Sequence, residues 1–197
     1  DRHSRALRGA FARLGYMMTN PEPHILDLPT FDDPVKLLIV VAPYFKDISD
    51  ELLCGAKTTL DEAGVTYDII EMPSVSELPT AIAIAERMSN FDGYVALGCF
   101  VRGGTALFDM ASNDSSHALQ MMGLSGLCIG NGILAVEAKL HAEARAEAKG
   151  RNKGGQAAAA ALHLGALSRK WARPSKGVGF NTGAIRLAGE NTGPNIA

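Results

Sequence analysis

The sequence predicts an α/β protein, a three-layer sandwich around a four-stranded parallel sheet, with additional tails at both ends. Short β-rich runs alternate with longer segments of helical periodicity through the middle of the chain. Such alternation produces a parallel sheet, because each crossover helix has to pack back on one of its faces. The chain is also 47% hydrophobic and 20% charged, a composition that can fill a core in a single domain.

The strands and helices are predicted from apolar runs and their period. Buried strands are expected at 37–41, 66–72 and 94–97, and a fourth begins at 127–129. Gly64 is placed to end the first helix and Pro73 to end the second strand. Helical spacing predicts five helices in the same part of the chain, at 48–63, 77–88, 107–123, 136–148 and 154–171.

The two ends differ from this core, so we divide the chain into residues 1–35, 36–171 and 172–197. Residues 1–19 form a basic amphipathic segment, with four arginines beside an apolar face. It has the composition of an organelle transit peptide remnant or of a helix on a membrane or protein surface. The protein is therefore expected in the cytoplasm, or in the matrix of a mitochondrion or plastid.

Residues 20–35 are expected to be an extended connector, and residues after Trp171 are rich in Gly, Asn and Pro. Tails of this composition are ordered only where something holds them. We therefore expect them to dock on other protein chains.

Composition and spacing exclude several classes of function. The net charge of −2 gives no reason to expect a nucleic-acid partner. No apolar run approaches the ~20 residues that cross a bilayer. Three widely separated cysteines in apolar surroundings, Cys54, Cys99 and Cys128, are expected to be buried thiols. The histidines show no metal-ligand spacing, and no metal or other cofactor is assigned.

Ligands of parallel sheets bind beyond the carboxyl ends of the strands, which directs attention to the loops at 42–47, 73–77 and 99–109. In the third loop, Gly104 and Thr105 precede a predicted helix, and Thr105 could both cap that helix and donate to a phosphate. An ordinary strand-to-helix turn explains the same residues. Ser74 and Glu77 have the spacing of a capping box, and Lys153 opens a helix where an anion would stabilise it.

Several stretches together resemble the lumazine synthase family. They occur in family order and spacing across about residues 36–171: KLLIVVA followed by DELLCGAK, then EMPSVSELP, ALGCFVRGGTALFD, IGNGILAVE and NKGGQAAAAAL. The resemblance implies a flavodoxin-like sandwich that assembles as a homopentamer, in some members as a larger shell. It implies condensation of 5-amino-6-(ribitylamino)uracil with 3,4-dihydroxy-2-butanone 4-phosphate to 6,7-dimethyl-8-ribityllumazine, the riboflavin precursor, without a cofactor and at a site between subunits.

The resemblance also assigns roles by position. Gly104 and Thr105 match the phosphate-holding loop, and Arg145 and Lys153 match cations near the phosphate. The substrate-binding positions are completed by three residues matching the pyrimidine and ribityl contacts, Tyr44, Ser76 and Glu77.

Three positions depart from the family pattern. Leu107 occupies the place of the histidine that handles proton transfer, and leucine cannot exchange a proton. Pro43 replaces an arginine, and Ser74-Val75-Ser76 replaces Gly-Ala-aromatic, where Val75 is expected to add bulk beside the substrate. The first hypothesis is therefore a family member with a degraded site, kept as a structural or assembly subunit of a larger complex. The alternative is an active lumazine synthase, a transferase of riboflavin biosynthesis.

Overall fold

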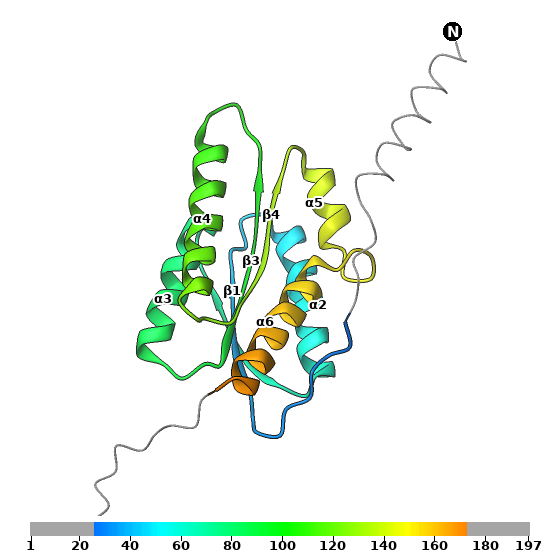
Figure 1. The fold of residues 1–197 in the computed structure, drawn as a ribbon. Helices are drawn as coiled ribbons and strands as arrows, with labels where there is room; N and C mark the ends of the chain where they lie inside the picture. The colour runs from blue at the N-terminus through cyan, green and yellow to red at the C-terminus, as the bar shows by residue number, and fades with distance from the viewer. Residues whose placement is uncertain (1–25, 173–197) are drawn as a thin grey trace, which may run out of the picture.

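A computed structural model describes residues 26–172 and shows a four-stranded parallel sheet (Figure 1). The strands are β1 (Lys36–Val41), β2 (Thr66–Glu71), β3 (Gly93–Val101) and β4 (Ile129–Val136), in the order β2-β1-β3-β4. The end of β1 is level with the middle of β3, since Val41 pairs with Leu97. The last residues of β3 therefore continue beside β4 alone, and they carry the following loop beyond the rest of the sheet.

Helices cover both faces of this sheet, which makes the fold the three-layer flavodoxin-like sandwich that we predicted (Figure 1). On one face lie α2 (Lys46–Glu62), α5 (Lys139–Ala146) and α6 (Lys153–Lys170). On the other lie α3 (Leu78–Met88), entered through the short 3-10 turn η1 (Val75–Glu77), and α4 (Leu107–Leu124). Two apolar cores result, one on each face.

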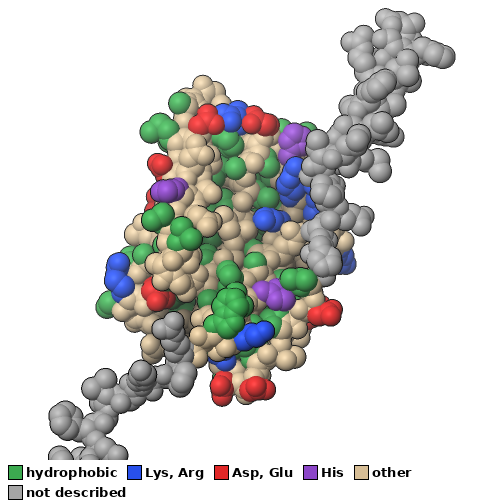
Figure 2. All heavy atoms as spheres, in the orientation of Figure 1, with side chains coloured by type: hydrophobic (Ala, Val, Ile, Leu, Met, Phe, Trp, Pro, Cys, Tyr) green, Lys and Arg blue, Asp and Glu red, His purple; other side chains and the backbone are tan. Residues whose placement is uncertain are grey.

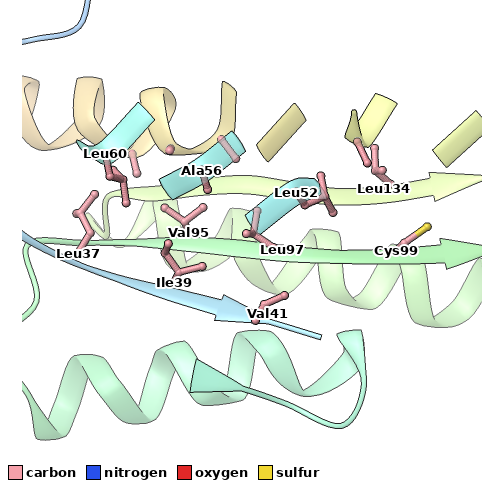
Figure 3. Packing of buried hydrophobic residues seen from close by; sticks show 14 of the residues in the cluster. Leu37, Ile39, Val41, Leu52, Ala56, Leu60, Val95, Leu97, Cys99 and Leu134 are labelled. Atoms are coloured by element: carbon pink, nitrogen blue, oxygen red, sulfur yellow. The ribbon is translucent and has the colours of Figure 1, made fainter. Parts of the chain in front are cut away.

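The side chains of β1 alternate between these two cores. Leu37, Ile39 and Val41 point toward α2 and pack with its buried residues Leu52 and Leu60 (Figure 3). Leu38 and Val40, which alternate with them along β1, pack in the second core with α3 and the end of α4. A strand buried on both faces has no polar side, which explains why β1 is an unbroken apolar run.

The connector before β1 packs on the described core. Val35 is buried, and Leu28 and Phe31 contact the α2-side cluster. Arg169 from the end of α6 stacks over the Phe31 ring, 5.4 Å from its centroid, and its Nη2 lies 2.9 Å from Asp92 Oδ1. The same guanidinium donates to backbone carbonyls of the connector. We predicted that residues 1–35 and 172–197 dock on other chains, but the connector from Leu28 to Val35 instead packs on the core of its own chain. Residues 1–25 and 173–197 lie outside the described part.

Several element boundaries differ from the prediction. Val136, predicted as a helix start, is the last residue of β4, and α5 begins only at Lys139. The fourth strand begins at Ile129, two residues later than predicted, and the Cys128 carbonyl just before it accepts from Tyr94 N at 2.8 Å. By contrast, Gly64 follows the end of α2 with a φ of +66°, the left-handed conformation for which glycine is suited.

The three cysteines are free, as predicted, but one of them is on the surface. Cys99 and Cys128 are buried, whereas Cys54 is exposed on α2. Its neighbours Leu52 and Ala56 on the same helix are fully buried, so Cys54 lies on the outer face of an amphipathic helix. In the described residues, no helix is long and apolar enough to cross a membrane.

Candidate functional site

The loop from Gly103 to Ala106 joins the projecting end of β3 to α4, and every residue in it is exposed. A Cβ added to Gly103 or Gly104 would find no atom within 4 Å, so both backbones face open space. Thr105 does not cap α4, contrary to our prediction: the N-cap is Ala106, and no side chain accepts there. The first N–H groups of α4 are therefore left without a side-chain cap, as an anion-binding helix start requires.

The Arg102 side chain joins the start of α4 to the residue that follows β4. Its Nη1 and Nη2 donate to Asp109 Oδ2 and Oδ1 at 2.9 and 2.8 Å, and its Nε lies 2.7 Å from Glu137 Oε2. The guanidinium carbon also lies 4.2 Å from the centroid of the Phe108 ring. The hydrogen bonds that Arg102 donates to Asp109, and then to Glu137, raise the pKa of Arg102, and the pKa of Asp109 is lowered chiefly by accepting from Arg102.

These charged partners were missed in the sequence, although a signal for them was present. Arg102 follows β3 and Glu137 follows β4, and parallel neighbours bring such positions together at one edge of a sheet. Figure 2 shows basic and acidic side chains gathered at this end of the molecule.

Leu107 is the first residue of α4, and 68% of its surface is exposed. Met110, one turn further, is 62% exposed. An apolar surface therefore occupies the position where a proton-transfer group was expected. His117 lies ten residues along the same helix, roughly 15 Å away at the rise of an α-helix.

Tyr44 stands after β1 with 74% of its surface exposed. Its ring meets Phe45 edge to face, with centroids 5.1 Å apart and planes at 78°. Phe45 in turn packs against the α2-side core, and this contact orients Tyr44 at the carboxyl edge of the sheet. An aromatic ring in that position can stack on a planar ligand.

The segment after β2 corrects two of our expectations. Ser74 Oγ accepts from Ser76 N at 3.1 Å and caps the short turn η1, so it does not form the predicted capping box with Glu77. Val75 is 3% exposed, and a Cβ on Gly98 would meet its Cγ2 at 2.8 Å. Val75 is thus part of the core and adds no bulk on the substrate side, while Ser76 and Glu77 are exposed.

Arg145 and Lys153 lie on the other layer of helices. Arg145 is half-buried at the end of α5 and donates to His141 O at 2.9 Å. Lys153 begins α6 after Asn152, whose φ of 47° and side-chain bond to Gly155 N (2.9 Å) form the helix cap. Burial lowers the pKa of Lys153.

One chain does not gather all these residues into a single pocket. Glu77 and the β3–α4 loop lead into α3 and α4 on one face of the sheet, whereas Arg145 and Lys153 belong to α5 and α6 on the other face (Figure 1). A cleft of about 700 Å³ between α2 and α5 contains none of them. Its lining is mainly acidic and apolar, for example Asp47, Glu51, Leu140, Glu143 and Glu147. In the described part of the chain, no group of three or more His, Cys, Asp or Glu is placed to hold a metal ion.

The family model and the most similar curated proteins that we compared all carry the same description. Residues 34–169 match the family model described as 6,7-dimethyl-8-ribityllumazine synthase. The chain is 52% identical over 164 residues to the 6,7-dimethyl-8-ribityllumazine synthase of Jannaschia sp. (strain CCS1), covering 83% of this chain and 92% of the relative. Proteins of the same name from Novosphingobium aromaticivorans and Bartonella henselae are 43% and 49% identical, covering 69% and 68% of this chain and 98% and 89% of theirs.

The matched region contains every element of the sheet and both layers of helices, and several relatives correspond over most of their own length. The chain therefore belongs to the 6,7-dimethyl-8-ribityllumazine synthase family.

Proposed function

We propose that this riboflavin-biosynthesis family member has a degraded active site and is retained as a structural or assembly subunit. Its anion-binding half is intact, because the open Gly103–Gly104 backbone precedes an uncapped helix start. Its proton-transfer half is missing. The observation that carries the proposal is Leu107, an exposed leucine at the first position of α4.

No described group near the loop replaces the missing histidine. Asp109 is bound to Arg102, and its lowered pKa makes it a weaker base near neutral pH. Arg102 has a raised pKa and remains protonated. Loss of a general acid–base group costs typically about 10²–10⁴ in rate.

Self-assembly is part of the proposal, with a homopentamer or a larger shell as the resemblance implies. Glu77 and the β3–α4 loop are on the opposite face of the sheet from Arg145 and Lys153 in one chain, which supports a site completed by a second copy. The outer surface of α4 supports association, because large apolar side chains are exposed along it: Leu107, Met110, Met121 and Leu124.

The terminal segments are proposed to dock on other chains of such a complex. The test is deletion of residues 1–25 or 173–197, which leaves every described contact in place. Either deletion should preserve unfolding behaviour and reduce the assembly's size by sedimentation. An unfolded product would contradict the proposed boundaries.

An active lumazine synthase is the second candidate, and Lys153 favours it. Burial lowers the pKa of this lysine, which brings its amine closer to the range where it can exchange a proton. Because α6 opens at Lys153, a phosphate there would also lie at a helix N-terminus.

Turnover of the two family substrates, followed by absorbance of the lumazine product, distinguishes these candidates. The natural chain is compared with Leu107→His and with a control, Leu124→His, which places a histidine on an equally exposed leucine at the far end of α4. We expect the natural chain and Leu124→His to be inactive and Leu107→His to gain activity.

Turnover by the natural chain at an ordinary rate, of order 1 s⁻¹ or more, would reject the degraded-site proposal in favour of active synthase. Inactivity of all three proteins would keep the structural role and show that the pocket lacks more than the histidine.

A further inference from the structure

We propose that Arg102 is a positioning residue that holds the anion loop in shape while being withheld from the anion itself. This inference rests on the proposed phosphate role of residues 103–106. Nothing in the family assignment decides whether an arginine beside that loop binds the ligand or arranges the loop. The contacts of its guanidinium decide it.

Every nitrogen of the Arg102 guanidinium already has a carboxylate partner. Two donate to Asp109 at 2.9 and 2.8 Å, and Nε lies 2.7 Å from Glu137. One face of the guanidinium plane is stacked on Phe108, 4.2 Å from the ring centroid. A phosphate would have to break this fork-to-fork arrangement in order to take a bidentate contact.

The charges lead to the same conclusion. Arg102 carries one positive charge against the two negative charges of Asp109 and Glu137, so the three together repel an anion. Attraction at this loop therefore comes from the backbone N–H groups of residues 103–106 and from the start of α4.

The loop needs such an anchor because it has no packing of its own. Residues 103–106 are exposed, and both glycines face open space. Arg102 ties the loop's two ends together, since its backbone N–H donates to Val136 O at 2.9 Å and its side chain holds Asp109 on α4. A single surface ion pair contributes little to stability, whereas a bidentate arginine within a network of charges contributes measurably.

The test uses a substitution for which a charge effect and a positioning effect predict opposite changes in phosphate affinity. Asp109→Asn removes a negative charge close to the loop, so electrostatics alone would tighten phosphate binding. Loss of positioning would weaken it. Asp114→Asn is the matched control, because it removes one exposed negative charge from the same helix and leaves the Arg102 contacts intact. Arg102→Lys keeps the charge but not the fork.

Two quantities are measured on the full chain: the dissociation constant for inorganic phosphate, and hydrogen exchange of the backbone amides at 103–109 without phosphate. We expect Asp109→Asn and Arg102→Lys each to weaken phosphate about tenfold, because the loop then has to be ordered on binding. Exchange should accelerate by a similar factor, since anchored loops open less readily. Asp114→Asn should neither weaken phosphate binding nor accelerate exchange.

Tighter phosphate binding by Asp109→Asn, or unchanged exchange in both variants, would overturn the positioning role. If the natural chain binds no phosphate while the variants still accelerate exchange, Arg102 does position the loop, and the phosphate part of the proposed function is rejected instead.

Discussion

Gly154, at the start of α6, lies against the carbonyl oxygen of Leu52 on α2. A Cβ built on Gly154 would be 1.9 Å from that oxygen and 2.7 Å from the carbonyl carbon. These atoms are backbone in the middle of a helix and cannot rotate away. The absence of a side chain at Gly154 is therefore what allows α2 and α6 to pack directly together over the sheet.

Gly154→Ala is expected to destabilise the fold by about 1–3 kcal/mol, because α6 has to move away from α2 to admit the methyl group. Gly165→Ala is the control, since a Cβ there meets nothing within 4 Å. It should stabilise the fold by about 0.5–1 kcal/mol through the better helix propensity of alanine. Urea unfolding of both variants measures the difference, and equal effects would contradict the close contact.

Tyr94→Phe is expected to lower the free energy of unfolding by about 1 kcal/mol, the value of a typical lost hydrogen bond. Tyr94 is 1% exposed, and its hydroxyl donates to Glu86 Oε2 at 2.7 Å. The ring, which Phe retains, continues to fill the second core. The Tyr67 hydroxyl donates to Asp61 at the surface, so Tyr67→Phe should change stability less. A larger loss for Tyr67 in denaturant unfolding would refute this ranking.

The loop anchored by Asp109 is expected to remain ordered in mild acid. Its lowered pKa means that the carboxylate contributes stability above its unfolded value of 3.8, and that this contribution disappears as pH falls through the folded pKa. NMR titration of the Asp109 carboxyl should therefore show a midpoint below 3.8, which Arg102→Gln shifts upward. An identical midpoint in both proteins would show that Arg102 does not hold this carboxylate.

Lys153 is expected to give a pH dependence of the same sign as Asp109, but at high pH. Burial lowers its pKa, so between the folded pKa and the ordinary value of 10.5 the unfolded chain binds more protons, and stability from this group rises with pH. Lys153→Met should therefore stabilise the protein near pH 7, with a smaller gain near pH 10. Lys149→Met, an exposed lysine before α6, is the control. Equal gains at both pH values would exclude a buried, easily deprotonated amine.

The sequence by itself determined the layers of this fold and the family. Residues 37–41 have no polar position because both faces of β1 are buried, and local composition alone reveals such a strand. The glycine loop after β3 and the helix that follows were also found from local pattern, since turn and helix signals depend on neighbours in the chain. The same is true of Gly64, whose positive φ is a local property.

Only the tertiary structure decided which partners the side chains of the candidate site contact. Val75 was expected beside the ligand and instead packs on Gly98, which comes from another strand. The Ser74 side chain accepts from Ser76 N–H, and the Glu77 N–H bonds the Ser74 carbonyl instead of its hydroxyl, because the chain enters α3 through a 3-10 turn. Arg102, Asp109 and Glu137 meet because β3 and β4 end side by side. Contacts between distant residues depend on how strands pair and helices cross, and a pattern along the chain does not encode those distances.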